Sequence, residues 1–174
     1  TKDVNSLAVS GMEIYAGTSQ GVFLSTNSGN SWSVVRSGLK DVFVRSLAVF
    51  GTDLFAGTMN GVFVSNNSDT SWSEISSRAI NKDVLSLAVS STNVFAGTPS
   101  GVSIFANLGG TWTEVNSGLT DMTVTSLAVS GANLFAGTRG SGVFHSANDG
   151  TSWREVNSGL TAMDVNSLVV SGTN

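Results

Sequence analysis

Short apolar runs, separated by turns rich in Gly, Ser, Asn and Thr, fill almost the whole chain. The Leu-Ala-Val run inside residues 4–10 is apolar on both faces, which is typical of a strand packed between layers. Residues 13–18 and 21–25 form two further short runs, and Trp-containing segments such as residues 71–75 end each cycle of the pattern. No segment shows the 3.6-residue apolar spacing of a helix. The pattern therefore predicts an all-β protein with essentially no helix.

The same pattern of four strands returns about every 40 residues. The motif Val-x-Ser-Leu-[Ala/Val]-Val occurs five times with spacings of 40, 40, 40 and 41, and both an Ala-Gly-Thr triplet and a Trp keep the same step. We expect a single repeat domain over residues 1–174. Its repeats cover about residues 4–43, 44–83, 84–123 and 124–164, and a partial fifth repeat covers residues 165–174.

Four-stranded units of this length predict a β-propeller with four complete blades and one extra strand. One such sheet cannot bury both of its faces alone, whereas neighbouring sheets stacked around an axis cover each other. The inner strands converge near the axis, and the small side chains of Ser6 and Ala8 suit that position.

Composition excludes several classes of protein. Charged residues are 11% of the chain and hydrophobic residues 40%, so disorder is not expected. The eight Lys and Arg residues are scattered and the net charge is −4, which argues against a nucleic-acid partner. No apolar run approaches the length needed to cross a bilayer, so no membrane insertion is expected. There is no cysteine, and the chain starts at Thr1, which favours a piece cut from a longer protein.

One eight-residue phrase recurs between the third and fourth strands of every repeat, for example SANDGTSW at residues 146–153. It resembles the Asp-box of BNR-repeat propellers, which is found in the sialidase superfamily, sortilin-type receptors and photosystem II assembly-factor-like proteins. The resemblance implies a structural turn, remote from active sites, with a Trp beneath it and a side chain that caps backbone N–H groups. Every copy carries Asn where the signature has Asp, and Asn can accept the same hydrogen bonds. The Asn and Trp positions are Asn27, Trp32, Asn67, Trp72, Asn107, Trp112, Asn148 and Trp153.

The same resemblance raises the possibility of a fragment of a sialidase-like glycosidase, an enzyme class that uses an arginine triad and a Tyr–Glu pair. Tyr15 is the only tyrosine and occupies a position where the other repeats have Phe, which favours a core residue. The arginines occupy different repeat positions, and His145 is the only histidine. We therefore expect no catalytic residues, no metal site and no cofactor.

Differences between the repeats point to one candidate binding surface. The connections between the second and third strands differ from repeat to repeat, as do the connections between repeats and the residue after the first Val of each repeat. In a propeller these segments lie at one end, and a uniform scaffold with one variable end is typical of a binding face, although neutral drift in loops is an alternative. The candidate residues are Arg45, Met59, Asn60, Met122, Arg139 and Met163.

We interpret the chain as a non-enzymatic interaction or recognition propeller, secreted or on a bacterial cell surface, with a carbohydrate-binding lectin as the alternative. The last motif, residues 165–170, nearly repeats residues 4–9, so both segments compete for one position. The chain is then a fragment of a longer propeller, half of an eight-bladed ring, or a donor of its last strand to a neighbour. We hypothesise self-association, with Val165, Leu168 and Val170 at the contact.

Overall fold

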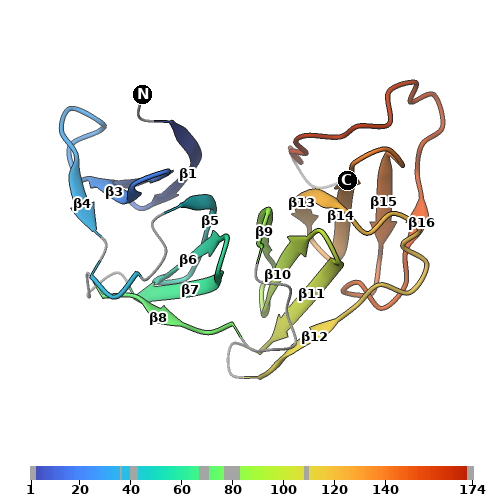
Figure 1. Ribbon diagram of the computed structural model, residues 1–174, viewed down its shortest axis with the longest axis horizontal. Coiled ribbons are helices and arrows are strands. Elements are labelled where there is room, and N and C mark those ends of the chain that lie inside the picture. Colours follow the sequence, from blue (N-terminus) through green and yellow to red (C-terminus); the bar gives the residue numbers. More distant parts are fainter. Residues whose placement is uncertain are drawn as a thin grey trace. The chain divides into compact units, whose positions relative to one another are not determined.

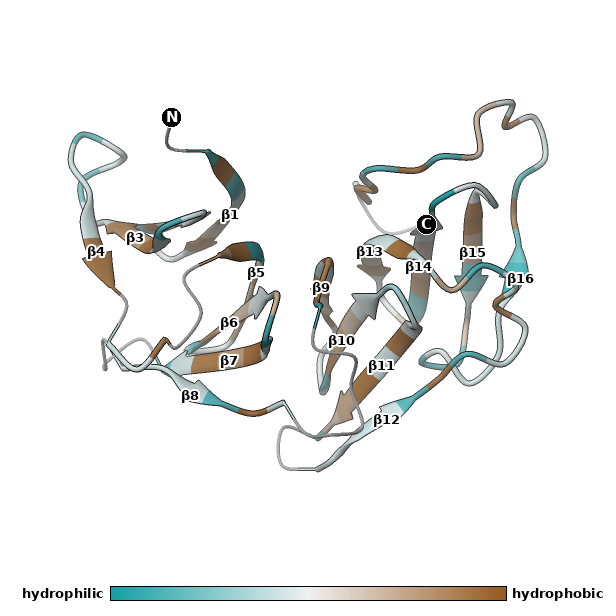
Figure 2. Cartoon of the chain, in the orientation of Figure 1, coloured by the Kyte–Doolittle hydropathy of each residue, from teal (hydrophilic) through white to brown (hydrophobic). Residues whose placement is uncertain are grey.

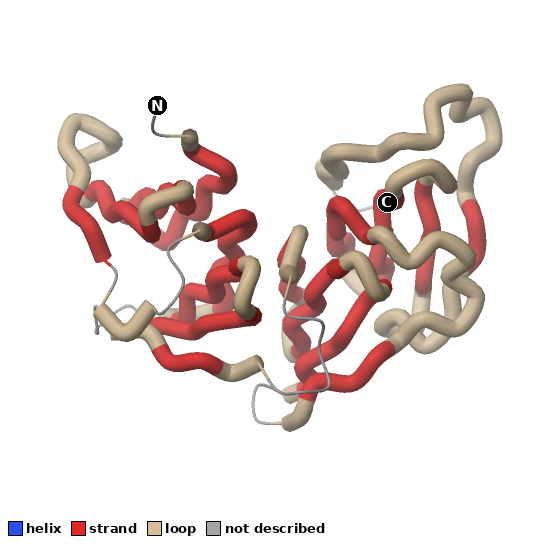
Figure 3. Tube along the Cα trace, in the orientation of Figure 1, coloured by secondary structure: helices blue, strands red, loops and turns tan. Residues whose placement is uncertain are grey.

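The computed structural model describes residues 3–35, 37–39, 43–66, 71–76, 83–107 and 110–171. Within these residues there are sixteen strands and no helix, as the apolar pattern predicts (Figure 3). The strands form four antiparallel four-stranded sheets, and in each sheet the strands pair in chain order (Figure 1). Each sheet coincides with one sequence repeat and is called a blade below.

The strand bounds are nearly the same in all blades. Blade 1 has β1 (Val4–Ser10), β2 (Glu13–Thr18), β3 (Gly21–Ser25) and β4 (Ser33–Val35). Blade 2 has β5 (Val44–Phe50), β6 (Asp53–Thr58), β7 (Gly61–Asn66) and β8 (Ser73–Glu74). Blade 3 has β9 (Ser86–Val89), β10 (Asn93–Thr98), β11 (Gly101–Ala106) and β12 (Trp112–Glu114). Blade 4 has β13 (Val124–Ser130), β14 (Asn133–Thr138), β15 (Val143–Ser146) and β16 (Arg154–Glu155).

The chain divides into two compact units, each with two blades. Unit 1 comprises Thr1–Ser76 with Lys82–Val84, and unit 2 comprises Ser77–Asn81 with Leu85–Asn174. Each unit has a hydrophobic core between its two blades. Hydrophobic residues concentrate on the strands, while the connecting turns are mostly pale or hydrophilic (Figure 2).

Each of these cores is built from two different blade faces. We call the face that carries Tyr15 and Val22 in blade 1 the trailing face, and the face that carries Leu47 and Trp72 in blade 2 the leading face. In unit 1 the trailing face of blade 1 packs on the leading face of blade 2, and in unit 2 blade 3 packs on blade 4 in the same way. One blade thus buries its neighbour's apolar side chains, as the repeat predicts.

Glycine in the Ala-Gly-Thr triplet allows the two inner strands to approach closely. A Cβ atom added to Gly17 would lie 2.7 Å from Cγ1 of Val44, and one added to Gly97 would lie 2.7 Å from Cγ1 of Val124. In each unit, the first Val of the second blade, Val44 or Val124, therefore sits directly on the glycine of the first blade, a contact that only glycine permits.

Polar contacts repeat between blades as well. The Leu47 N–H donates to Ser6 Oγ at 2.9 Å, and in unit 2 the Leu127 N–H donates to Ser86 Oγ at 3.0 Å. The indole Nε1 of Trp72 donates to the Val35 carbonyl at 3.1 Å, and that of Trp153 donates to the Val115 carbonyl at 2.7 Å. The contact between the two blades of each unit therefore has the same two hydrogen bonds around its apolar centre.

The end of the chain differs from the sequence-based expectation of an extra strand at residues 165–170. Asp164 forms one antiparallel bridge with Arg139, and the Val165 N–H donates to the Thr138 carbonyl at 3.0 Å. Residues 165–171 then continue outside any strand. A strand needs a neighbour for its backbone hydrogen bonds, and none of the described strands pairs with residues 166–171.

Candidate functional site

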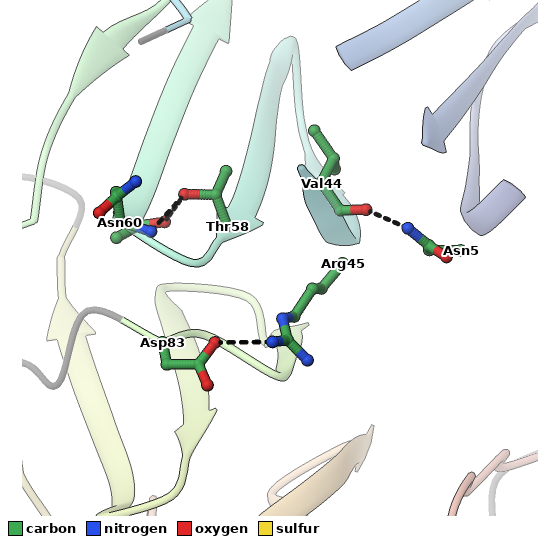
Figure 4. Close-up of polar contacts among 7 residues, drawn as sticks. Asn5, Val44, Arg45, Thr58, Asn60 and Asp83 are labelled. Carbon is green, nitrogen blue, oxygen red and sulfur yellow. Dashed lines mark hydrogen bonds and ion pairs between the residues drawn. The ribbon is translucent and has the colours of Figure 1, made fainter. Parts of the chain in front are cut away.

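The turns between the second and third strands hold variable residues on a uniform frame. In blade 2 the Thr58 hydroxyl donates to the Gly61 carbonyl at 3.1 Å and accepts the Asn60 N–H at 3.0 Å (Figure 4). Thr18 and Thr98 make the same pair of hydrogen bonds in blades 1 and 3, and Thr138 donates to the Gly142 carbonyl in blade 4. The threonine side chains thereby fix the turns, and the residues between them are free to vary.

The residue after the first Val of an inner strand is set out of register. The pairing of β1 with β2 shifts between Val4 and Ser6, and the same shift occurs in β5 and β13. Such a bulge leaves one residue outside the ladder and re-aims its side chain. The bulged residues of these three strands are Asn5, Arg45 and Thr125.

In unit 1, Arg45 forms an ion pair with Asp83, which directly precedes the first Val of the next repeat. The distance from Arg45 Nη2 to Asp83 Oδ1 is 3.2 Å, and both side chains are about one-third exposed (Figure 4). The guanidinium carbon also lies 5.6 Å from the centroid of the Phe43 ring. Asn5 donates through Nδ2 to the Val44 carbonyl at 2.9 Å. This part of unit 1 thus presents a cation held by a carboxylate and an aromatic ring.

In unit 2, the corresponding residues surround a small hollow. A hollow of about 250 Å³ is lined by Thr125, Arg139, Asp164, Val165 and Asn166. The backbone N–H groups of Gly140 and Gly142 both donate to the Met163 carbonyl, at 3.2 and 2.9 Å. These hydrogen bonds hold the turn of blade 4 against the segment that follows the blade. The hollow offers charges of both signs and hydroxyl and amide groups, a set that suits a polar ligand.

All six candidate binding residues fall within these segments. Arg45, Met59 and Asn60 belong to unit 1, and the Met59 and Asn60 side chains are exposed at the turn after β6. Met122, Arg139 and Met163 belong to unit 2, where the Arg139 N–H donates to the Thr123 carbonyl at 3.1 Å. In each unit, we call the turns after its second strands (β2 and β6, or β10 and β14), the segments that follow its blades and its bulged residues the variable rim of that unit.

Sequence reasoning missed the acidic side chains of the variable rim. Asp83 and Asp164 each directly precede the first Val of a repeat, as Asp3 also does. The recurring Asp-Val pair was a usable signal, because it places a carboxylate beside the bulged residue of the preceding blade. The effect of the bulge is visible in the packing: Val44 and Leu47 are three residues apart, yet both lie against Gly17. Strict strand alternation would put them on opposite faces.

The turns between the third and fourth strands contain the Asn of the eight-residue phrase that resembles an Asp-box. In blade 4, Asn148 Oδ1 accepts the Ser152 N–H at 3.0 Å and the Ser146 hydroxyl at 2.8 Å, and Ser146 Oγ accepts the Gly150 N–H at 2.9 Å. Asn27 makes the matching contacts in blade 1, whereas Asn67 lies outside the described residues. The described hydrogen bond of Asn107 differs, because its N–H donates to Asn93 Oδ1.

Two of the Trp residues of these turns, Trp72 and Trp153, contact the preceding blade of their own unit. Trp72, Trp112 and Trp153 are buried, and the rings of Phe105 and Trp112 lie 5.3 Å apart. Trp32 differs from them because it is exposed. Trp72 and Trp153 thus belong to the hydrophobic cores of their units.

Among the described residues, the pKa values of Tyr15 and His145 are shifted. Tyr15 is buried in the core of unit 1 and donates to Glu13 Oε2 at 2.7 Å. Burial, and then the hydrogen bond to Glu13 and its charge, raise the pKa of Tyr15. His145 lies 2.7 Å from Asn133 Oδ1 and 4.9 Å from the Phe135 ring, and burial followed by the charge of Arg154 lowers its pKa. No cluster of three metal-ligating side chains occurs among the described residues.

Comparison with known proteins gives the fold. No family model and no curated protein matches the chain. Among solved structures, the extracellular domain of BT4673 from B. thetaiotaomicron has a TM-score of 0.77 at 20% identity, covering 97% of this chain and 25% of that one. The computationally designed protein Ika4 has a TM-score of 0.68 at 18% identity, covering 84% of this chain and 91% of that one. YCF48 bound to D1 peptide has a TM-score of 0.66 at 18% identity, covering 88% of this chain and 52% of that one.

These similarities, at 20% identity or less, concern architecture alone. An ancestral GH74 enzyme is also similar, with a TM-score of 0.71 at 20% identity over 88% of this chain and 24% of that chain. The chain thus spans about a quarter of two of these proteins, about half of YCF48 and most of Ika4. Together with the four sheets, they show that the chain has the fold of a β-propeller built from four-stranded blades. No helix among the described residues is long and apolar enough to span a membrane.

Proposed function

We propose that the chain is a non-enzymatic recognition propeller that binds an extended protein segment with its variable rim. One observation carries this proposal: the same threonine-fixed turn recurs in the blades with different exposed residues. These residues are Gln20 in blade 1, Met59 and Asn60 in blade 2, Pro99 and Ser100 in blade 3, and Arg139 in blade 4. A rigid frame with changeable side chains is the arrangement that binding loops use on stable scaffolds.

The chemistry of the rim supports a peptide-like ligand. The hollow in unit 2 offers Arg139 and Asp164 for charged groups, and Thr125 and Asn166 for backbone amides. Exposed methionines in the same unit, Met122 and Met163, supply adaptable apolar contacts. Alternating polar and apolar contacts suit an extended segment, which presents both its backbone and its side chains. The similar structure of YCF48 carries a bound peptide, which supports this class of ligand.

The non-enzymatic part of the proposal rests on the environment of Tyr15. Burial raises the pKa of its hydroxyl, which keeps the proton on the oxygen at neutral pH and disfavours a nucleophilic role. Glu114 and Glu155 lie on the exposed strands β12 and β16. Location outside the bacterial cell is part of the same proposal, with the extracellular domain of BT4673 as its support.

A selection experiment tests the proposal. Random peptides displayed on phage are selected against the chain, and dissociation constants are then measured for individual synthetic peptides. We expect Arg139→Ala and Met163→Ala to weaken binding by about tenfold or more, since each removes roughly 1.4 kcal/mol or more of contact energy. Met12→Ala is the matched control, because Met12 is exposed in the turn between β1 and β2, at the other end of β2.

Two results would contradict the proposal. One is the recovery of no peptide that the chain binds, combined with rim-dependent binding to a glycan array, which would support the lectin alternative. The other is hydrolysis of fluorogenic glycosides that Tyr15→Phe abolishes, which would make the chain an enzyme.

A further inference from the structure

Asp83 in unit 1 and Asp164 in unit 2 hold equivalent positions in the fold. Each directly precedes the first Val of a repeat. The N–H of that Val donates to the carbonyl of the threonine that fixes the preceding turn, at 2.9 Å to Thr58 in unit 1 and at 3.0 Å to Thr138 in unit 2. Because the backbone is anchored in the same way at both places, differences around the two carboxylates come from the neighbouring side chains.

The carboxylate of Asp83 is paired with a cation of its own unit. Arg45 is the bulged residue of β5, and its Nη2 lies 3.2 Å from Asp83 Oδ1 (Figure 4). The bulge takes the arginine out of the strand ladder and re-aims its side chain. A guanidinium is planar and presents a fork of N–H donors that matches a carboxylate. Unit 1 therefore shows which group fits opposite this carboxylate.

The carboxylate of Asp164 lacks that cation. In blade 4 the bulged residue is Thr125, whose side chain is too short to take the place of an arginine. Its hydroxyl lies within hydrogen-bond distance of the Gly137 and Val165 carbonyls. Within the part of the chain that the structure describes, the Asp164 side chain makes no hydrogen bond or ion pair, and it is exposed.

The hollow in unit 2 lies at the place of the missing side chain. Its lining includes Thr125 and Asp164, the equivalents of the arginine and the aspartate of unit 1, and its volume is about 250 Å³. Pockets for drug-sized ligands have volumes of about 300–1,000 Å³, so this hollow suits a single side chain. Val165 offers an apolar wall for the stem of a long side chain, and Asn166 offers an amide oxygen that can accept an N–H.

We infer that this hollow binds an arginine side chain of the ligand, with the guanidinium opposite Asp164 in the place that Arg45 takes in unit 1. The inference rests on the proposed function, because it names a side chain that the variable rim of unit 2 selects from an extended protein segment. Arginine fits better than lysine because its fork of donors can serve the Asp164 carboxylate and the Asn166 amide oxygen together. A lysine ammonium is a compact and strongly hydrated charge.

Arg139 adds a second requirement for the ligand. It lines the same hollow from the turn after β14, where blade 2 has Met59. Among the described residues it forms no ion pair with Asp164. Its charge therefore opposes a ligand that carries only positive charges, and it can pair with a ligand carboxylate. We expect the selected segments to carry an acidic residue close to the arginine rather than a run of basic residues.

An NMR titration of the isotope-labelled chain tests the inference with two small probes. N-acetylarginine amide carries the guanidinium, and N-acetylcitrulline amide has nearly the same shape without the charge. We expect weak, saturable binding of the arginine probe that shifts the backbone resonances of Thr125, Val165 and Asn166. The dissociation constant should be several-fold higher for the citrulline probe, since it lacks the ion pair.

Three substitutions locate the binding. Asp164→Asn keeps the shape of the side chain and removes its charge, so it should abolish the preference for arginine over citrulline. Asp149→Asn is the matched control, because Asp149 is exposed in the turn after β15, at the other end of that strand, and should leave the preference unchanged. Thr125→Arg should abolish probe binding, since the longer side chain fills the hollow as Arg45 fills the equivalent place. Circular dichroism checks that each variant folds.

The converse substitution in unit 1 provides an independent readout. Arg45→Thr removes the side chain that pairs with Asp83 and should open an equivalent place beside that carboxylate. We expect the variant to bind a second equivalent of the arginine probe, with new shifts at Asp83 and Val84. A chain with Asp83→Asn added to Arg45→Thr should lose the arginine preference of this second site.

The inference is overturned if the arginine probe does not bind, if it binds no better than the citrulline probe, or if Asp164→Asn leaves its preference unchanged. Peptides selected on phage that depend on Arg139 and Met163 but not on Asp164 also overturn it, and they leave the proposed function in place. Arginine-dependent binding of the probe without the recovery of any peptide supports the arginine site and contradicts the proposed function.

Discussion

Blades 1 and 2 have similar sequences and the same four strands, yet their leading faces differ in environment. Trp72 is 5% exposed and donates its indole N–H to blade 1, while Trp32 is 42% exposed. Because the residues are alike, the difference comes from the neighbouring blade alone. The comparison shows that the repeat has two kinds of interaction, those made within a blade and those made between blades, and only the second kind depends on position in the chain.

The largest expected effect comes from removing a Trp that a neighbouring blade covers. Trp153→Ala should lower the free energy of unfolding by about 3–5 kcal/mol, because it leaves a cavity and removes the hydrogen bond to the Val115 carbonyl. Trp32→Ala should cost at most about 1 kcal/mol in dilute solution, where the exposed ring has little to lose. Chemical denaturation of both variants measures the two losses of unfolding free energy, and equal losses would contradict the exposure of Trp32.

Two glycines with the same backbone conformation provide the next test. Gly118 and Gly159 have φ values of 85° and 82°, so replacement of either by Ala strains the left-handed backbone by about 1–2 kcal/mol. A Cβ on Gly118 would also overlap the Trp153 carbonyl, whereas one on Gly159 would meet no atom within 4 Å. We expect Gly118→Ala to cost about 1–3 kcal/mol more than Gly159→Ala in thermal or chemical denaturation.

Asn27 and Asn148 test interactions made within a blade, because the hydrogen bonds of each Asn lie within one turn. Each accepts a backbone N–H and a Ser hydroxyl, with matching distances in blades 1 and 4. Asn27→Ala and Asn148→Ala should therefore each cost about 1 kcal/mol of unfolding free energy. A large difference between the two variants would show that the turns also depend on a neighbouring blade.

The smallest effect concerns pH. Burial, and then the charge of Arg154, lower the pKa of His145, so the folded state binds fewer protons than the unfolded state between that pKa and about 6.5. Stability should therefore fall as the pH drops below about 6.5. His145→Gln should remove this part of the pH dependence, which denaturation at pH values on both sides of the window can measure. If the unfolding free energy of His145→Gln depended on pH as steeply as that of the original chain, other groups would be responsible for the pH dependence.

The repeated motif was sufficient to predict the four-stranded blades, since the Val-x-Ser-Leu motif, the Ala-Gly-Thr triplet and the Trp each mark one place in every blade. The fourth strands were predicted too long: β8 covers only Ser73–Glu74, and Trp72 lies outside it. There the indole serves a contact with the preceding blade rather than the ladder. Local sequence does not record such contacts between blades.

The candidate site was predictable only in part, for the same reason. Variation among repeats located the variable rim, and it singled out Arg45 and Arg139. It could not find Asp83 as the partner of Arg45, because the two residues stand at opposite ends of the repeat 44–83 and meet only after the chain folds. The exposure of Trp32 could not be predicted either, since its sequence context matches that of the buried Trp72 and Trp153.

The bulge in each inner strand has a consequence for how the protein can acquire new specificities. Asn5, Arg45 and Thr125 differ in size and charge, yet the register on both sides of them is the same. A residue outside the ladder can be exchanged with little effect on the pairing of its strand. These positions can therefore vary while the strand pairing around them stays the same. A combinatorial library restricted to them should yield folded proteins with altered ligand preferences.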